Sequence, residues 1–188
     1  MKQVVFSGDE QFLFTVLGNQ TVKMWSLSGK CVRVYNGFAE RILSFEMSGD
    51  RQFFAVGDEK SISYWKTQSL LFKTELKSEV KCVGLSADGR TAVGCAGKVM
   101  VLSSASGDTI KEILLHKMVS NVQFLEGQIL QVTFVDKTAQ KYDSEYKMVE
   151  EGVGESGIGD RIAFNNSILV RIEGNSIVAE DNRPLVEW

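Results

Sequence analysis

The sequence shows little sign of acid–base or metal chemistry. His116 is the single histidine, and no cysteine or carboxylate partner stands at metal-ligand spacing from it. A general base or a metal ligand needs such partners, so a structural role is the better interpretation of His116. We predict no catalytic residue, no metal and no cofactor, and expect that the protein is not an enzyme.

The cysteines Cys31, Cys82 and Cys95 do not indicate a disulfide framework. They are odd in number, widely spaced and free of any C-x-x-C pair, which favours a reducing compartment. Cys82 and Cys95 fall on two successive predicted strands. We expect them to pack as small buried hydrophobes.

The segment Gly152-Val153-Gly154-Glu155-Ser156-Gly157 matches the G-x-G-x-x-G pattern of dinucleotide-binding loops. That chemistry needs a helix directly after the glycines to bind pyrophosphate. Here a predicted strand follows from Ile158, so we interpret the segment as a linker. Ser86-Ala87-Asp88-Gly89 is interpreted as a β-turn.

A set of basic and aromatic residues in or beside predicted loops is the candidate binding site. A net charge of −3 over 188 residues gives no overall field that would attract nucleic acid, although a local patch still can. Ordinary solvated turns explain any single member, so the prediction concerns the set. Its members are Phe38, Arg41, Lys60, Lys81, Lys98 and Lys117.

No targeting or membrane signal is visible in the sequence. Residues 1–8 lack a basic-then-apolar pattern, and no apolar run approaches the roughly 18 residues of a membrane span. We expect an intracellular protein, cytoplasmic or nuclear, without a membrane partner.

Laid over itself at a step of about 40 residues, the chain shows about five tandem copies of one pattern. The first two copies share a Ser-Gly-Asp turn, an apolar stretch, a second small polar turn and an alternating run that ends in tryptophan, and the third repeats the scheme with Ser86-Ala87-Asp88-Gly89 as its first turn. That last position holds Trp25, Trp65, Leu102 and Tyr142 in the first four copies. The fifth copy, from about Arg161, is weaker.

Each copy divides into four short runs with period-two alternation, which predicts strands rather than helices. In the first copy the predicted strands are Val4–Phe6, Phe12–Leu17, Thr21–Ser26 and Cys31–Tyr35. The segment from Ile110 to His116 is short for a helix and fits the fourth strand of the third copy. The sequence has one proline and 17 glycines, a composition that also suits many short strands joined by tight turns. We therefore predict an all-β fold.

The segment TVKMWSLSGKCVRVYNG resembles the third strand, tryptophan, turn and fourth strand of a WD repeat, and the resemblance covers nearly the whole chain. It implies a single β-propeller domain with about five four-stranded blades at residues 1–36, 37–77, 78–116, 117–152 and 158–188. Trp25, Trp65 and Leu102 would then lie in the blade cores. The Trp-Asp pair of the family survives only as Tyr142-Asp143.

The resemblance also implies a buried polar network in the fourth copy. There His116 would pair with Asp136, near Thr133 and Tyr142. The turn aspartate is matched more loosely by Asp58 in the second copy and by Asn19 in the first. Where the histidine is missing, apolar contacts between neighbouring sheets would hold the blades instead.

Three interpretations of the ring remain open. The chain is a piece of a longer propeller, a small five-bladed ring, or an open array that a partner completes. An incomplete or partner-completed ring would present apolar sheet faces at its ends, and such surface usually marks an interaction site.

The predicted function is a non-enzymatic protein-interaction scaffold that docks other protein subunits of a larger complex. Ribosome assembly is the complex we would test first, because that machinery contains many such propellers. RNA binding through the loop lysines and arginine is the alternative, and a propeller enzyme is the less favoured one. No small-molecule substrate is expected.

Overall fold

The structure is a computed structural model. It describes residues 3–7, 9–16, 20–38, 41–67, 69–153, 163–164, 169–173, 176–179 and 184–187, with side chains described up to Val153. These residues form two compact units by their internal contacts. Unit 1 combines Met1–Ile42 with Ile158–Trp188, and unit 2 is Leu43–Gly157.

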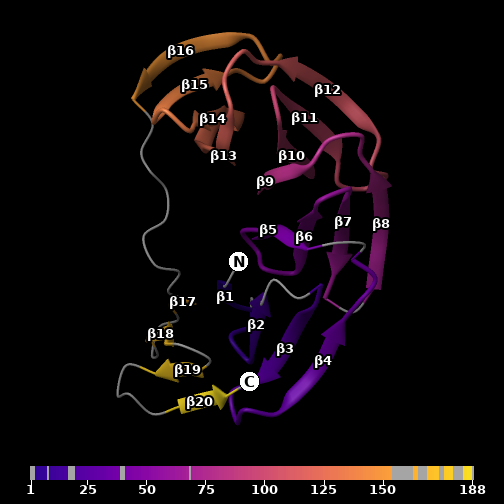
Figure 1. Ribbon diagram of the computed structural model, residues 1–188, viewed down its shortest axis with the longest axis vertical. Helices are drawn as coiled ribbons and strands as arrows, with labels where there is room; N and C mark the ends of the chain where they lie inside the picture. The colour runs from indigo at the N-terminus through magenta and orange to yellow at the C-terminus, as the bar shows by residue number, and fades with distance from the viewer. Residues whose placement is uncertain are drawn as a thin grey trace. The chain divides into compact units, whose positions relative to one another are not determined.

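The described residues form five four-stranded antiparallel sheets, each built from four strands that follow one another in sequence (Figure 1). Sheet 1 contains β1 (Gln3–Phe6), β2 (Phe12–Val16), β3 (Val22–Ser26) and β4 (Cys31–Tyr35). Sheet 2 contains β5 (Ile42–Met47), β6 (Phe53–Asp58), β7 (Ser61–Lys66) and β8 (Ser69–Glu75). Sheet 3 contains β9 (Val80–Leu85), β10 (Arg90–Cys95), β11 (Lys98–Ser103) and β12 (Thr109–Leu114). Sheet 4 contains β13 (Val119–Phe124), β14 (Leu130–Phe134), β15 (Thr138–Tyr142) and β16 (Met148–Val153).

Sheet 5 is described by its backbone pairing. It contains β17 (Ala163–Phe164), β18 (Leu169–Glu173), β19 (Ser176–Ala179) and β20 (Pro184–Glu187). Within unit 1, β1 lies against β17 and β18. Sheets from the two ends of the sequence are therefore neighbours in unit 1.

The predicted all-β class is confirmed for the described residues. Their one helical segment is the 3-10 turn Glu126–Gln128, and none of their helices has the length and apolar character to cross a bilayer. The strands of the first copy match the prediction to within one residue at each described end. Thr109–Leu114 is a strand, as predicted for the segment before His116.

A repeated β-bulge marks the same point in every sheet. The pairing between the third and fourth strands shifts register immediately before Trp25, Trp65, Leu102, Tyr142 and Val178. The first four are the positions that the sequence repeat aligns, and each faces the first or second residue of the neighbouring second strand. The repeat in the sequence is therefore also a repeat of strand register and of local irregularity.

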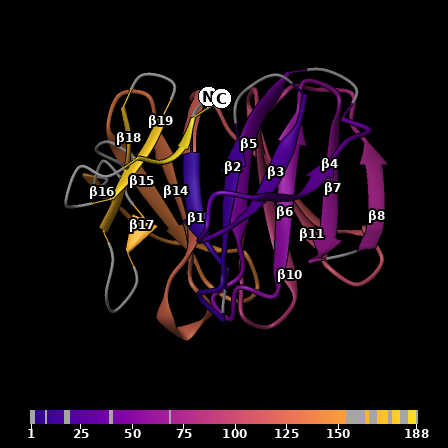
Figure 2. The same ribbon diagram turned by 90° about the horizontal axis from the view of Figure 1, so that it is seen from below.

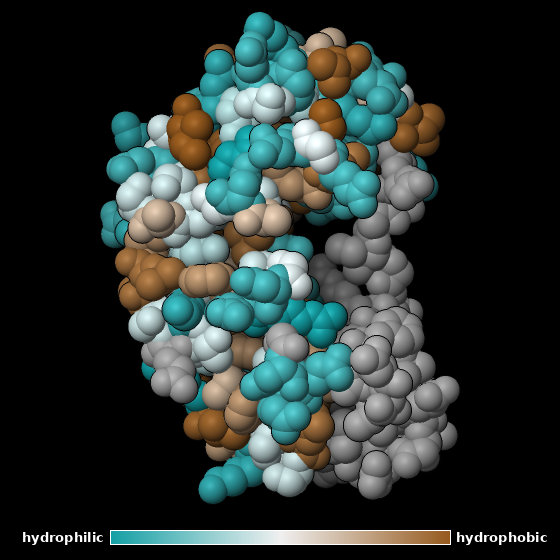
Figure 3. Space-filling view, turned by 180° about the vertical axis from the view of Figure 1, so that it is seen from behind, coloured by the Kyte–Doolittle hydropathy of each residue, from teal (hydrophilic) through white to brown (hydrophobic). Residues whose placement is uncertain are grey.

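In sheets 1 to 4, burial decreases from the second strand to the fourth. β14 is buried throughout, whereas every residue of β16 is exposed. Figure 2 shows β6, β7 and β8 following one another across sheet 2, with β8 the outermost. On the face seen in Figure 3, exposed apolar side chains form small separate groups among hydrophilic ones. Over the described part of the molecule, the exposed large apolar residues of the fourth strands include Val32, Val34, Leu70, Leu71, Ile110, Leu114, Met148 and Val149.

Inside unit 2, β9 lies against β6 on one side and β13 on the other. Glycines permit this close approach. A Cβ added to Gly57 would lie 2.3 Å from a methyl carbon of Val80, and one added to Gly84 would lie 2.6 Å from the carbonyl oxygen of Val122. Apolar clusters fill both junctions, with Leu102 in the one beside sheet 2 and Tyr142 in the one beside sheet 4.

The two aligned tryptophans differ in burial. Trp25 is 7% exposed, and its indole N–H donates to Thr15 Oγ1 at 2.9 Å. Trp65 is only half-buried, with its ring stacked on Phe54 at 6.0 Å and its N–H donating to Ser63 Oγ at 3.1 Å. Trp25 and Leu102 are thus buried, whereas Trp65, which was expected in a core as well, is only partly buried.

Candidate functional site

The turn between the first and second strands has the same construction in sheets 1, 2 and 3. A serine hydroxyl donates to the carboxylate two residues later: Ser7 to Asp9 at 2.5 Å, Ser48 to Asp50 at 2.6 Å and Ser86 to Asp88 at 2.5 Å. The same serine oxygen accepts the N–H of the first residue of the next strand, at 3.0 Å for Phe53 and 2.8 Å for Arg90. These side chains satisfy the turn locally, so the turns form without help from other sheets.

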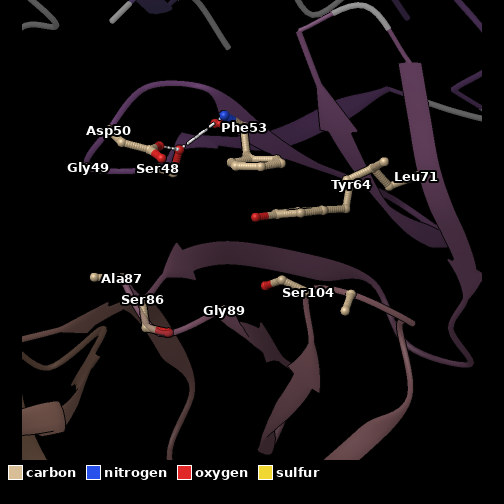
Figure 4. A pocket seen from close by; sticks show the side chains of 11 residues that line it. Ser48, Gly49, Asp50, Phe53, Tyr64, Leu71, Ser86, Ala87, Gly89 and Ser104 are labelled. Atoms are coloured by element: carbon tan, nitrogen blue, oxygen red, sulfur yellow. Dashed lines mark hydrogen bonds between the residues drawn. The ribbon is translucent and has the colours of Figure 1, made fainter.

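Two of these turns line a groove of about 520 Å³ between sheets 2 and 3, within unit 2. Figure 4 shows Phe53, Tyr64 and Leu71 on the sheet 2 side of the groove and the small residues of sheet 3 opposite them. The residues that form its walls and lip are Asp50, Phe53, Tyr64, Leu71, Ser86 and Ser104. One wall is therefore aromatic and apolar, and the other carries hydroxyl groups.

The aromatic wall is a row of rings across three strands. Phe53 on β6 and Tyr64 on β7 are parallel, 5.8 Å apart and inclined by 7°. Phe72 on β8 continues the row 5.4 Å from Tyr64. The Nζ of Lys66 lies 5.7 Å from the centre of the Phe53 ring, which shows that this wall already attracts a cation.

The charge at the groove lip comes from Asp50. Its hydrogen bond from Ser48 and a second from the N–H of Gln52, at 3.1 Å, hold the pKa of its carboxyl below the ordinary value. Burial raises the pKa of Tyr64, whose hydroxyl also interacts with Ser104 and lies in the field of Asp50. At neutral pH the groove therefore offers an anionic carboxylate, a phenolic hydroxyl and ring faces.

The corresponding junction between sheets 3 and 4 is closed by one side chain. The guanidinium of Arg90 lies 5.1 Å from the centre of the Phe124 ring and 5.7 Å from that of Tyr146. It donates to Asp88 Oδ1 from Nε at 2.9 Å and to the Tyr146 hydroxyl from Nη1 at 2.9 Å, and its Nη2 is 2.8 Å from Asp88 Oδ2. We call Asp88, Arg90, Phe124 and Tyr146 the Arg90 clamp.

The structure does not bring the predicted loop residues together as one open cationic surface. Phe38 is buried, at 6% exposure, so it is not available for docking as expected. Arg41 and Lys60 are exposed. The remaining three lysines form ion pairs: Lys81 with Glu79, Lys98 with Glu112 at 2.9 Å, and Lys117 with Asp136 at 3.2 Å and Glu151 at 3.7 Å.

The predicted polar network of the fourth copy is wrong in its central member. His116 is exposed, and Lys117 takes the expected place beside Asp136. The carboxylate of Asp136 is itself exposed and accepts from Thr138, whose hydroxyl is 2.6 Å away. A contact that favours this position of Lys117 is the ring of Phe134, whose centre lies 5.3 Å from the Lys117 Nζ.

The other two members of that network, Tyr142 and Thr133, are buried, but neither hydroxyl bonds to His116 or Asp136. Tyr142 donates its hydroxyl hydrogen to Gln140 Oε1 at 2.7 Å. Thr133 is buried in β14, and no hydrogen-bond partner of its hydroxyl is present among the described residues.

A buried turn aspartate does exist, but in the second copy. Asp58 is 1% exposed, and its carboxylate accepts from the N–H of Lys60 at 2.8 Å and from the N–H and hydroxyl of Ser61 at 2.6 and 2.8 Å. The serine three residues after Asp58 was the available sequence signal. Asn19, the expected counterpart in the first copy, lies outside the described residues.

The cysteine thiols of sheet 3 are buried, whereas Cys31 is exposed. Burial, with the neighbouring Cys95 as a second cause, raises the pKa of Cys82 to about 12, so this thiol is protonated at neutral pH and packs as a hydrophobe. Across the described ranges, no three His, Cys, Asp or Glu side chains are grouped to hold a metal ion. Of the glycine-rich segment, Gly152 and Val153 end β16, and 154–157 lie outside the described residues.

The groove and the Arg90 clamp were missed by sequence reasoning, which singled out lysines in the loops. A visible signal was the arginine that stands two residues after Asp88, where the second copy has glutamine and then phenylalanine. No protein-family model matches this chain, and no curated protein matches it in sequence.

Proposed function

We propose that the protein is a non-enzymatic docking platform, a WD-repeat-like propeller that binds a segment of a partner protein in the groove between sheets 2 and 3. The observation that carries the proposal is the groove itself: an apolar, aromatic wall beside hydroxyl groups and a carboxylate. Such a surface, apolar with a few placed polar groups, is typical of binding pockets.

The repeated bulge supports the propeller interpretation. Successive four-stranded sheets with the same register and the same irregularity are what tandem blades require. Outer strands that are mostly exposed, and inner strands that approach closely at glycines, also agree with sheets stacked side by side. The frame around the groove is then rigid, which favours recognition by preformed surfaces.

A protein segment suits the groove better than RNA suits the loops. Carboxylates neutralise Lys81, Lys98 and Lys117 where they stand, and phosphate contacts would have to displace these pairs. The groove presents a carboxylate at its lip, which repels a phosphate backbone. RNA binding remains the alternative, and a steep dependence of RNA affinity on salt would establish it.

Selection of peptides tests the proposal. Random 12-residue peptides displayed on phage would be selected against the immobilised full chain, and enriched peptides would be synthesised and their affinities measured. Ala105→Trp places a large ring at a residue that lines the groove, and Ser144→Trp places the same ring in the corresponding exposed turn of sheet 4.

We expect enriched peptides to bind the wild type and Ser144→Trp alike and to lose at least about tenfold in affinity for Ala105→Trp, the loss of one well-placed contact. Peptides that bind Ala105→Trp as tightly as the wild type, or a selection that enriches nothing, would contradict docking in the groove.

A further inference from the structure

Phe53 and Arg90 occupy equivalent backbone positions at the two junctions of unit 2, the one between sheets 2 and 3 and the one between sheets 3 and 4. Phe53 in sheet 2 and Arg90 in sheet 3 are each the first residue of their second strand, and each donates its N–H to the serine of the preceding turn. The turn carboxylates, Asp50 and Asp88, are likewise equivalent. Side-chain differences therefore decide what fills the space beside each turn.

In the sheet 3–sheet 4 junction that space holds a guanidinium. Arg90 donates to Asp88 from Nε, has its Nη2 2.8 Å from the other carboxylate oxygen, and lies over two rings. Its side chain is 12% exposed, so the clamp removes most of it from water. The chain thus shows directly which chemistry fits between a turn carboxylate and aromatic rings in this frame.

The sheet 2–sheet 3 junction lacks both halves of that arrangement. Phe53 stands where Arg90 would supply the cation. Gly107 stands where Tyr146 would supply a ring: both have a positive φ, 80° and 62°, and both donate an N–H to the carbonyl that begins the turn before the fourth strand. A Cβ on Gly107 would lie 2.7 Å from the ring of Phe72, so no side chain fits there.

The carboxylate of Asp50 consequently has no counter-ion of the kind that Asp88 has. Its hydrogen bonds come from Ser48 and the N–H of Gln52, and it forms no ion pair with any described residue. Asp50 lines the groove together with Phe53 and Tyr64. The groove therefore contains an ionised carboxylate that has no ion-pair partner among the described residues. It also contains aromatic rings with open space beside them.

We infer that the groove binds an arginine side chain of a partner protein, which places its guanidinium against the Phe53–Tyr64 wall and pairs it with Asp50. This inference rests on the proposed function and names the residue that the docked segment must present. Leu71, exposed at the mouth of the groove, offers an apolar contact for the aliphatic stem of the arginine.

Arginine fits better than lysine or an apolar residue. A planar guanidinium stacks on a ring and pairs with a carboxylate through two N–H groups at once, which a compact ammonium does not do. An apolar side chain would bury the Asp50 carboxylate without a partner, which is unfavourable.

The test uses blocked glycine pentapeptides that carry a central arginine, lysine or leucine. Each is titrated into the full 188-residue chain, labelled with ¹⁵N, while the amide signals of residues 48–53 and 86–89 are followed. We expect the arginine peptide to shift both groups of signals with a dissociation constant on the order of 1 mM. The lysine peptide should bind at least about fivefold more weakly and the leucine peptide weaker still.

Asp50→Asn is the decisive variant and Asp9→Asn its matched control. Both carboxylates accept a serine hydroxyl and a backbone N–H in the same turn, and the asparagine oxygen accepts both in each variant. Only Asp50 lines the groove. The arginine peptide should lose about tenfold in affinity for Asp50→Asn and nothing for Asp9→Asn.

Three results overturn the inference: no shift with the arginine peptide, equal binding of arginine and lysine, or equal binding to Asp50→Asn and the wild type. If phage-selected peptides still bind the groove in any of those cases, docking stands and only the arginine assignment fails. If Ala105→Trp also leaves those peptides unaffected, the groove itself is excluded as the docking site.

Discussion

At the junction of sheets 3 and 4, the space beside the first turn is filled from within by Arg90, its carboxylate Asp88 and two rings. At the junction of sheets 2 and 3, the equivalent space is a groove, because Phe53 and Gly107 replace Arg90 and Tyr146. The backbone frame and the Ser-x-Asp turn are shared. The repeated backbone therefore determines where such a space forms. The side chains at two positions decide whether the space is filled and holds the sheets together or stays open for a partner.

The largest expected loss of stability is at the close contact between sheets 3 and 4, and it is compared with a substitution at the open groove. Gly84→Ala should lower the free energy of unfolding by about 2–3 kcal/mol, because its Cβ would meet the backbone oxygen of Val122 at 2.6 Å. Gly49→Ala is the control, since nothing lies within 4 Å of a Cβ there and it lines the groove. Urea unfolding measures both. A loss below about 0.5 kcal/mol for Gly84→Ala would mean that sheets 3 and 4 separate easily.

The next effect concerns the clamp. Arg90→Ala should lower the free energy of unfolding by about 2 kcal/mol, because it removes a mostly buried cation and leaves Asp88 without its partner. Lys66→Ala, the corresponding exposed cation over a ring at the groove, should cost less than about 0.5 kcal/mol. Equal losses in urea unfolding would show that the two junctions do not differ in the way described.

A third prediction concerns a substitution that gives the junction of sheets 2 and 3 the arginine found at the junction of sheets 3 and 4. Phe53→Arg places a guanidinium three residues after Asp50, at the strand position that Arg90 occupies two residues after Asp88. In a double-mutant cycle with Asp50→Asn, we expect a coupling of about 0.5–1 kcal/mol in the free energy of unfolding. The arginine peptide should no longer bind Phe53→Arg. A coupling near zero would show that the groove does not accommodate a guanidinium beside Asp50.

The smallest effect is an acid dependence that differs between the junctions. The pKa of Asp88 is lowered chiefly by its hydrogen bond from Arg90, and that of Asp50 chiefly by Ser48. A carboxyl whose folded pKa is depressed contributes stability above its unfolded pKa, near pH 4, and loses it as the pH falls through the folded pKa. Urea midpoints at pH 6 and pH 3 should therefore differ less in Asp88→Asn and Asp50→Asn than in the wild type. The reduction should be greater for Asp88→Asn, and the opposite order would argue against a stabilising role of the clamp.

Local patterns in the sequence predicted the strands, because alternation and turn residues act over a few positions. The four aligned residues Trp25, Trp65, Leu102 and Tyr142 share one register position, as their spacing predicted. The same local logic overestimated the burial of Trp65 and failed for Phe38. Whether a side chain is enclosed depends on what a neighbouring segment places over it, and a single repeat does not contain that information.

By itself the sequence determined an all-β chain of repeated four-stranded units, the first three of which carry Ser-x-Asp turns. Only the tertiary structure decided which turn residues find partners across a junction. Arg90 meets a tyrosine 56 positions away, Lys117 rather than its neighbour His116 meets Asp136, and Asp50 meets no cation among the described residues. The physical reason is that turn chemistry is satisfied within five residues, whereas charge pairing and ring stacking depend on which sheets pack side by side.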